Sequence, residues 1–166
     1  RYYLVASIGG GGFGEVFSAH DRKTERDVAL KVLRPERVND PTSRERFRRE
    51  VQLVARLRHP NTVRIADVGE TDAGAPYFVM ERLNGLSLGQ LVGRCGPLPE
   101  ALVGQVLIEA LRGLAEAHDA GIVHRDIKPE NLFVAHVGDE AIIKVLDFGV
   151  AASLTAPDSG LTGTGE

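Results

Sequence analysis

Residues 124–131 of the chain read HRDIKPEN and residues 147–149 read DFG, and these two stretches decide the fold. DFG follows the apolar run 142–146, and a second apolar run, 132–135, precedes the turn-forming Gly138 and Asp139. Apolar runs on either side of such a turn predict a β-hairpin. Asp147 is therefore expected where the chain leaves this hairpin.

The stretch before HRDIKPEN predicts one long helix with a wide apolar face. Gly121 follows the last periodic residue, the position where glycine commonly ends a helix. We expect the apolar face to be buried, because its residues recur at the spacing of one side of a helix. These residues are Leu102, Val103, Val106, Leu107, Ala110, Leu111 and Leu114.

The chain before residue 84 has the character of a sheet with one helix. Strand-like runs rich in apolar and β-branched residues cover 2–8, 15–20, 27–33, 63–68 and 77–81. Residues 43–57 instead show a helical period that stops before Pro60. Its apolar positions are Phe47, Val51, Val54 and Leu57. The sequence therefore predicts an α+β fold.

Composition and charge exclude several classes of protein. The 166 residues include 43% hydrophobic and 26% charged side chains, the balance of a packed globular protein. The formal net charge of −3 gives no bulk attraction to nucleic acid or to an anionic membrane. The single cysteine, Cys95, forms no intrachain disulfide, and no apolar run reaches the length of a membrane span. We expect a cytoplasmic segment with no nucleic-acid partner and no direct membrane contact; a tether elsewhere in a longer protein stays open.

Three glycines near the start of the chain form a candidate phosphate-binding loop. Gly9, Gly11 and Gly14 satisfy G-x-G-x-x-G, a pattern that dinucleotide-binding folds and ordinary turns also produce. Residues 15–19 after the third glycine read as a strand, whereas a dinucleotide-binding unit continues into a helix. The glycines are thus predicted to join two strands. On the glycines alone, a flexible turn is as good an interpretation as a phosphate cradle.

Lys31 and Glu50 are charged residues in apolar surroundings. Lys31 interrupts the apolar run 28–33, where a charge needs a partner or a ligand unless it extends to the rim of the sheet. Glu50 shares the apolar face of the predicted helix with Phe47 and Val54. A buried Lys31–Glu50 ion pair would satisfy both charges.

The order of these motifs resembles that of the protein kinase family: glycine loop, strand lysine, helix glutamate, H-R-D-x-K-x-x-N and DFG. The resemblance covers the whole chain, and the phrases HPNTV, GIVHRDIKPENLF and VLDFGVA are most similar to bacterial eukaryotic-type (Hanks-type) Ser/Thr kinases. It implies a bilobal α+β fold. Residues 1–83 would form a five-stranded antiparallel amino-terminal lobe with one helix, and residues 84–166 an incomplete, mainly helical carboxy-terminal lobe that stops within the activation segment.

For the nucleotide, the resemblance implies a binding site for ATP between the two lobes. The three glycines would cover the phosphates, and Lys31, oriented by Glu50, would bind the α- and β-phosphates. The adenine ring would lie between Val16, Ala29 and Phe133. Met80 would be the gatekeeper residue beside it, and Glu81 and Leu83 would offer backbone groups to the adenine edge.

For catalysis, the resemblance implies separate roles for the two aspartates. Asp126 would accept the proton of the substrate hydroxyl, and Lys128 would neutralise the transferring phosphoryl group. A lysine at this place is typical of Ser/Thr kinases rather than of tyrosine kinases. Asn131 and Asp147 would hold Mg²⁺, which prefers hard oxygen ligands. Phosphoryl transfer needs mainly such positioning and positive charge around phosphate oxygens.

The resemblance also implies regulatory and structural residues. Arg125 would sense phosphate on Thr162 or Thr164, in a stretch that is otherwise a generic polar loop. A stacked column of four side chains would connect the lobes, with His124 as a packing residue rather than an acid or base. The column consists of Val54, Ile65, His124 and Phe148.

We therefore expect a Ser/Thr protein kinase whose complete form transfers the γ-phosphoryl group of ATP, with Mg²⁺, to Ser or Thr hydroxyls of proteins. Autophosphorylation within a homodimer is part of this expectation. The alternative is a truncated or pseudokinase-like module that binds nucleotide or acts as a scaffold without catalysis. Lys31, Asp126 and Asp147 are all present, which favours the enzyme. This segment by itself is expected to be inactive, because the substrate-docking segment lies beyond Glu166.

Overall fold

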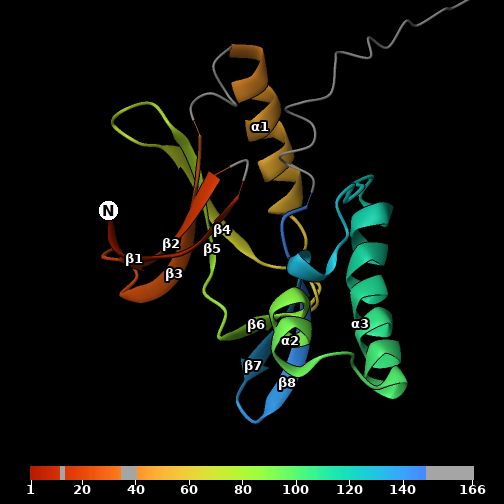
Figure 1. Cartoon of the computed structure of the whole chain (residues 1–166). Helices are drawn as coiled ribbons and strands as arrows, with labels where there is room; N and C mark the ends of the chain where they lie inside the picture. The colour runs from red at the N-terminus through yellow and green to blue at the C-terminus, as the bar shows by residue number, and fades with distance from the viewer. Residues whose placement is uncertain (12–13, 35–40, 149–166) are drawn as a thin grey trace, which may run out of the picture.

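The computed structural model describes residues 1–11, 14–34 and 41–148. They form two antiparallel β-sheets, with one helix beside the first sheet and two helices beside the second (Figure 1). This arrangement confirms the predicted α+β fold with a five-stranded antiparallel sheet. The second, mainly helical part contains three short strands.

The first sheet has the strand order β1-β2-β3-β5-β4. Strand β3 runs through its middle and is mostly buried, because apolar residues face both of its sides. The pairing of β3 with β5 places Ala29 opposite Met80 and Lys31 opposite Phe78. The elements are β1 (Tyr2–Gly11), β2 (Gly14–Asp21), β3 (Arg26–Leu33), α1 (Pro41–Val54), β4 (Ile65–Glu70) and β5 (Pro76–Glu81).

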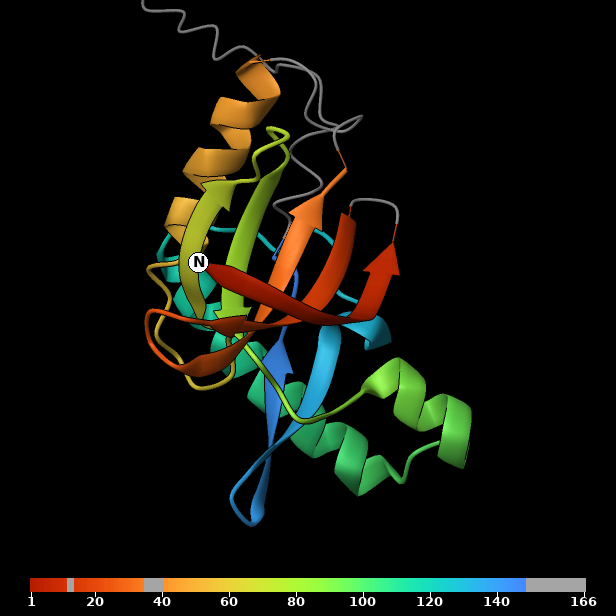
Figure 2. The ribbon, with the colours of Figure 1, turned by 90° about the vertical axis from the view of Figure 1, so that its left-hand side faces the viewer.

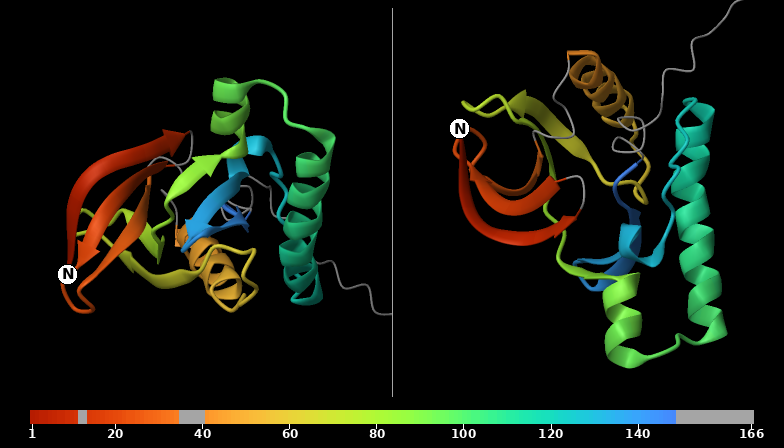
Figure 3. Two further views of the ribbon diagram at one scale, coloured as in Figure 1. Left: turned by 90° about the horizontal axis from the view of Figure 1, so that it is seen from below. Right: turned by 45° about the horizontal axis from the view of Figure 1, so that its top comes forward.

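The second sheet has the order β6-β7-β8 and contains the hairpin predicted around Gly138. Figure 2 shows this hairpin below the five-stranded sheet, and in both views of Figure 3 it lies between that sheet and α3. The elements are β6 (Gly85–Ser87), α2 (Leu88–Cys95), α3 (Glu100–Asp119), the 3-10 turn η2 (Pro129–Asn131), β7 (Leu132–Val137) and β8 (Glu140–Val145).

One hydrophobic core connects the two sheets. The connection from α1 to β4 adds backbone bonds to β8: the Val63 amide donates to the Val145 carbonyl at 3.0 Å, and the Val145 amide donates to the Asn61 carbonyl at 2.8 Å. These bonds fix the first sheet on the second. The core includes Phe47, Val51, Val54, Ile65, Phe78, Met80, Val106, Ala110, Leu132, Ile143, Val145 and Phe148.

The two predicted helices differ from the structure in detail. Helix α1 ends at Val54, because the Leu57 amide bonds to the Val54 carbonyl in a tighter turn. Helix α3 buries Val106 and Ala110, whereas Leu107 and Leu111 are 51% and 62% exposed. The predicted apolar stripe is therefore wider than the face that the described residues cover. In the same ranges, no helix combines the length and apolarity that crossing a bilayer requires.

The sequence patterns indicate helix after Gly85 but do not separate α2, an eight-residue helix, from the long helix α3. Its start is a capping box: Ser87 Oγ accepts a hydrogen bond from the Gln90 amide at 3.2 Å, and Gln90 Oε1 accepts one from the Ser87 amide at 3.0 Å. Gly85, the first residue of β6, has φ 151°, and a Cβ there would collide with the Val134 carbonyl oxygen. The close approach of β6 to β7 thus requires this glycine.

Candidate functional site

Asp126 lies at the centre of a hydrogen-bonded loop between α3 and β7. Its Oδ2 accepts hydrogen bonds from Lys128 Nζ at 2.8 Å and from Asn131 Nδ2 at 3.0 Å. Asn131 Nδ2 also donates to the Asp126 carbonyl at 2.7 Å, so one amide group holds both the backbone and the carboxylate. The structure thus brings three predicted residues of the HRDIKPEN stretch together, with Asp126 exposed to solvent.

The charges in this loop favour an ionised carboxylate. The hydrogen bond from Lys128 lowers the pKa of Asp126, and the one from Asn131 acts in the same direction. Reciprocally, the hydrogen bond to Asp126 raises the pKa of Lys128. The Asp126 carboxylate is therefore ionised at neutral pH.

His124 is a packing residue that also fixes the loop backbone. Its Nε2 lies 2.7 Å from the Leu146 carbonyl oxygen, and its Nδ1 lies 3.3 Å from the Asp126 amide nitrogen. A carbonyl accepts and an amide donates, so the neutral tautomer with its hydrogen on Nε2 satisfies both bonds. Burial lowers the pKa of His124, and its ring packs on Phe148 at a centroid distance of 4.8 Å. The contact with Phe148 is the one that the sequence predicts.

Lys31 forms an ion pair with Asp147 in this structure, and the role of Glu50 in orienting Lys31 stays a prediction. Lys31 is 8% exposed on β3, and its Nζ lies 2.6 Å from Asp147 Oδ1. Asp147 has φ 51°, a left-handed backbone that turns the chain after β8. Glu50 lies half-buried on α1, and its charge is not left without a partner there. A buried ammonium pairs with the carboxylate that the fold brings within reach, and here that is Asp147.

Asn131 and Asp147 offer the donor atoms that magnesium prefers. Asn131 directs Nδ2 toward Asp126, which leaves Oδ1 for another partner. Asp147 directs Oδ1 toward Lys31, and its side chain is 38% exposed. The Leu146 amide donates to the Asn131 carbonyl at 2.8 Å and holds the two segments together. The donor set fits Mg²⁺, which typically takes one or two protein oxygens beside phosphate and water; within the described ranges, no three acidic, histidine or cysteine side chains form a ready metal cluster.

The three glycines of the predicted phosphate loop differ in their surroundings. Strands β1 and β2 pair as a hairpin across Gly11 and Gly14, as the sequence predicts. A Cβ at Gly9 or Gly11 would meet no atom within 4 Å, whereas one at Gly14 would collide with the Val32 carbonyl oxygen. Gly14 is therefore required by the pairing of β2 with β3. Gly9 and Gly11 leave space in which a ligand can approach the backbone.

The residues predicted around adenine come from both sheets and from the segment between them. Ala29 and Met80 are cross-strand neighbours in the first sheet, and Val16 packs against the core that contains both. Phe133 lies half-buried on β7 of the second sheet. Glu81 ends β5, and Leu83 lies in the connection to β6. An adenine ring held between the two sheets would contact residues from both sheets and from the segment that joins them.

Three side chains of the predicted column, Val54, Ile65 and Phe148, belong to one hydrophobic core. Val54 of α1, Ile65 of β4 and Phe148 line one cavity of about 20 Å³. A space of that size admits about one water molecule. His124 extends the column through its contact with Phe148. Lys31 and Asp147 line the same cavity, which places their ion pair beside the column.

Arg125 is the one regulatory residue of the prediction that the structure describes. It is exposed beside Asp126, with φ 64°. Thr162 and Thr164 lie outside the described residues. The role of Arg125 as a phosphate sensor therefore stays a prediction.

Sequence patterns did not single out three charged residues that hold the site together. Glu116 of α3 accepts hydrogen bonds from the consecutive amides of residues 58 and 59 at 2.8 Å each. Glu109, on the same helix, accepts one from the Ile143 amide of β8 at 2.9 Å. Lys144 is buried on β8. It interrupts the apolar run 141–146 as Lys31 interrupts 28–33, and this signal could have identified it.

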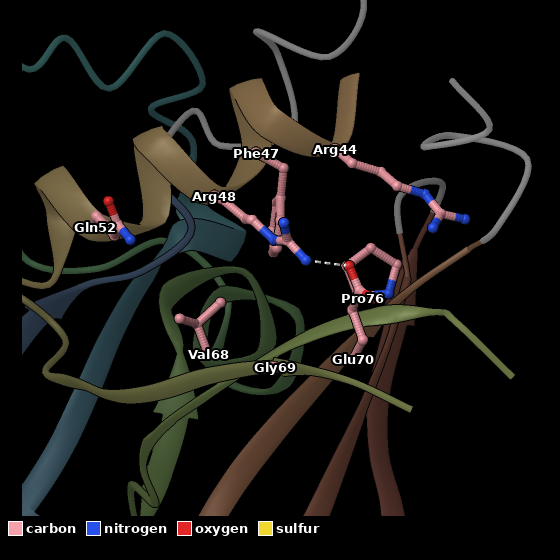
Figure 4. A pocket seen from close by; sticks show the side chains of 8 residues that line it. All are labelled: Arg44, Phe47, Arg48, Gln52, Val68, Gly69, Glu70 and Pro76. Carbon is pink, nitrogen blue, oxygen red and sulfur yellow. Dashed lines mark hydrogen bonds and ion pairs between the residues drawn. The ribbon is translucent and has the colours of Figure 1, made fainter. Parts of the chain in front are cut away.

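A larger cavity of about 260 Å³ lies between α1 and the β4–β5 hairpin (Figure 4). Figure 4 shows Arg48 directed from α1 toward Glu70, and their ion pair measures 2.7 Å. Phe47 and Val68 supply apolar walls. The residues that line this cavity include none of those predicted to bind ATP or magnesium. It is therefore separate from the candidate site.

Comparison with known sequences agrees with this geometry. A family model described as protein kinase domain matches residues 2–165. A probable serine/threonine-protein kinase of Corynebacterium efficiens is 42% identical over 167 residues, which cover 99% of this chain and 25% of that protein. The serine/threonine-protein kinase PrkC of Bacillus subtilis is 42% identical over 156 residues, 94% of this chain and 24% of that protein. The chain spans about a quarter of the length of the curated relatives it matches.

Solved structures show the same likeness in three dimensions. The kinase domain of Mycobacterium tuberculosis PknI matches with a TM-score of 0.76 at 34% identity, over 90% of this chain and 60% of that chain. Rad53 in complex with AMP-PNP matches with a TM-score of 0.78 at 27% identity, over 90% of this chain and 38% of that chain. The similarity thus extends over nearly all of this chain.

Proposed function

The chain belongs to the protein kinase family, and from this premise we propose that it is the ATP-binding and catalytic part of a longer Ser/Thr protein kinase. In this proposal residues 1–83 are the ATP-binding lobe and residues 84–166 begin the catalytic lobe. The complete protein transfers the γ-phosphoryl group of ATP to Ser or Thr hydroxyls of proteins and, in a homodimer, of itself. The observation that carries the proposal is the cluster of Asp126, Lys128 and Asn131.

Asp126 acts on the acceptor hydroxyl. Its carboxylate is ionised at neutral pH, as an ordinary aspartate is, and Lys128 lowers its pKa further. As the hydroxyl oxygen bonds to the γ-phosphorus, the bond from that phosphorus to the oxygen of ADP breaks and the hydroxyl proton passes to Asp126. Lys128 lies within 2.8 Å of the same carboxylate and offers positive charge to the phosphoryl oxygens in transit.

Lys31, Asn131 and Asp147 hold the phosphate end of the nucleotide. Mg²⁺, when bound, would supply positive charge that offsets the negative charge of the phosphates. The Oδ1 atom of Asn131 and the Oδ2 atom of Asp147 would hold it. Lys31 exchanges its bond to Asp147 for bonds to the α- and β-phosphates. Gly9 and Gly11 let the backbone approach these phosphates, since no side chain stands in the way.

Phosphoamino-acid analysis of the complete protein tests the proposal. The complete protein is needed because the α3 side chains Leu107 and Leu111 are more than half exposed in this segment. Incubation with Mg-ATP and a generic acceptor protein should produce phosphoserine or phosphothreonine on the acceptor and on the kinase itself. ATP binding without any transfer would support a nucleotide-binding module instead, and phosphotyrosine alone would contradict the substrate class.

A further inference from the structure

Lys144 is a buried charge that no step of the proposed reaction uses. It lies on β8 and is 9% exposed. Strand pairing places it opposite Phe133, which is proposed to lie against adenine. A buried ammonium group is costly unless it is paired and hydrogen-bonded. Both of its partners come from outside β8.

The partners of Lys144 are Glu81, the last residue of β5, and Thr62, which lies in the connection from α1 to β4. Its Nζ donates to Glu81 Oε1 at 2.7 Å and to the Thr62 carbonyl oxygen at 3.3 Å. The side chains of Lys144 and Glu81 are 11% and 32% exposed, so the ion pair is largely shielded from water. Removing the amine would therefore leave the carboxylate poorly solvated in its present position.

Glu81 is in turn bound twice to Arg64. Its Oε1 accepts a hydrogen bond from the Arg64 amide at 2.8 Å, and its own amide donates to the Arg64 carbonyl at 3.0 Å. The Lys144 amine, the Glu81 carboxylate and the backbone of residues 62–64 thus form one connected network. Glu81 is also a residue whose backbone is proposed to face the adenine edge.

The strand that carries Lys144 leads directly to the catalytic residues. Leu146 donates its amide to the Asn131 carbonyl at 2.8 Å, and its carbonyl accepts from His124 Nε2 at 2.7 Å. Asp147 follows. A short stretch of β8 and its exit therefore connects the network at Glu81 to the residues that would hold magnesium.

We propose that Lys144 is a positioning residue that fixes the adenine-binding segment at Glu81 relative to the strand that presents Asp147. The inference rests on the proposed function, because Glu81 has this role only if a nucleotide base binds beside it. Lys144 differs from Lys31 in what it orients. Lys31 is bonded to Asp147 at the phosphate end, whereas Lys144 is bonded to the segment at the base.

Binding of adenosine, which has no phosphates, separates the two lysines. In calorimetric titrations of the complete protein, Lys144→Met should weaken adenosine binding at least about fivefold, a modest share of what a hydrogen bond to a charged group contributes. Lys31→Met should leave adenosine binding unchanged and weaken Mg-ATP binding. Lys23→Met, at an exposed lysine of the β2–β3 turn, is the matched control and should change neither.

A second substitution distinguishes positioning from a general loss of stability. Glu81→Gln in the Lys144→Met background removes the unpaired carboxylate but does not restore the bonds to β8, so adenosine affinity should stay within about twofold of that of Lys144→Met, and a return to the wild-type affinity would contradict a positioning role. If Lys144→Met does not fold, Lys144→Gln, which retains a donor for the Thr62 carbonyl, is measured in its place. A lower melting temperature with unchanged adenosine affinity would overturn the proposal. Wild-type protein that neither binds adenosine nor transfers phosphate would remove the proposed function itself, and the role of Lys144 with it.

Discussion

The amine of Lys31 and the carboxylate of Asp147 lie 2.6 Å apart, although 116 positions separate them in the chain. One comes from the central strand of the first sheet and the other follows the last strand of the second. Both are proposed to contact the phosphate end of ATP, Lys31 directly and Asp147 through magnesium. Binding of Mg-ATP therefore has to exchange this ion pair for contacts to the nucleotide.

Lys31→Met should lower phosphoryl transfer by the complete protein at least about 100-fold, because it removes a positive charge from the oxygens that gain charge in the transition state. Steady-state kinetics with a Ser/Thr acceptor measures the effect, with Lys23→Met as the control. The apolar stem keeps the packing of β3, so the fold should persist. Activity within a few-fold of wild type would exclude Lys31 from the phosphate site.

Lys128→Met should raise the pKa of Asp126. In the native loop Lys128 is the main cause of the lowered pKa, so its loss moves the value back toward about 3.9, the ordinary range of an aspartate. Carboxyl-carbon NMR titration of wild type and variant measures the change directly. A pKa that stays where it is in wild type would show that Asn131 and the loop backbone, rather than Lys128, hold the charge.

His124 should make stability depend on pH below neutrality. Its pKa is lowered in the fold, so as the pH falls through about 6.5 the unfolded state binds a proton that the native state does not. The free energy of unfolding should therefore fall more steeply between about pH 7.5 and 5.5 in wild type than in His124→Gln. Gln can still donate to the Leu146 carbonyl. Equal slopes in denaturant titrations would contradict a buried neutral histidine.

Gly113→Ala should destabilise the complete protein by roughly 1–3 kcal/mol, the usual range for overpacking. A Cβ at Gly113 would lie 2.9 Å from the Asn61 carbonyl oxygen, in the connection that α3 holds against β8. Gly93→Ala in α2 is the matched control, because a Cβ there meets no atom within 4 Å. That change should be neutral or stabilise by up to about 1 kcal/mol. Denaturant unfolding compares the two, and equal effects would mean that α3 does not pack closely on this connection.

The sequence alone predicts those features that depend on neighbouring residues. Gly121 ends α3 with φ 74°, as its place after the apolar stripe indicates. The hairpins on either side of Gly11–Gly14 and Gly138 follow from strand-like runs around turn residues. The HRDIKPEN stretch is short enough that its internal bonds, from Lys128 and Asn131 to Asp126, join residues two to five positions apart.

Pairings between distant residues are harder to predict. Lys31 has an acidic candidate on α1 in Glu50, but the turn at Asp147 brings a different carboxylate to it. Lys144 and Glu81 are 63 positions apart, and their pairing depends on how β8 packs against the end of β5. The burial of the apolar stripe on α3 is hard to predict for the same reason. The sequence shows which residues are apolar but not which neighbours cover them.

The central claim is that Asp126 accepts the proton of the substrate hydroxyl, and the turnover of Asp126→Asn in the complete protein tests it most directly. Asparagine keeps the shape of the side chain and cannot accept that proton. A positioned general base contributes about 10²- to 10⁴-fold, so kcat should fall at least about 100-fold with the KM for ATP nearly unchanged. Equal rates of phosphate transfer to Ser and Thr in wild type and variant would contradict it.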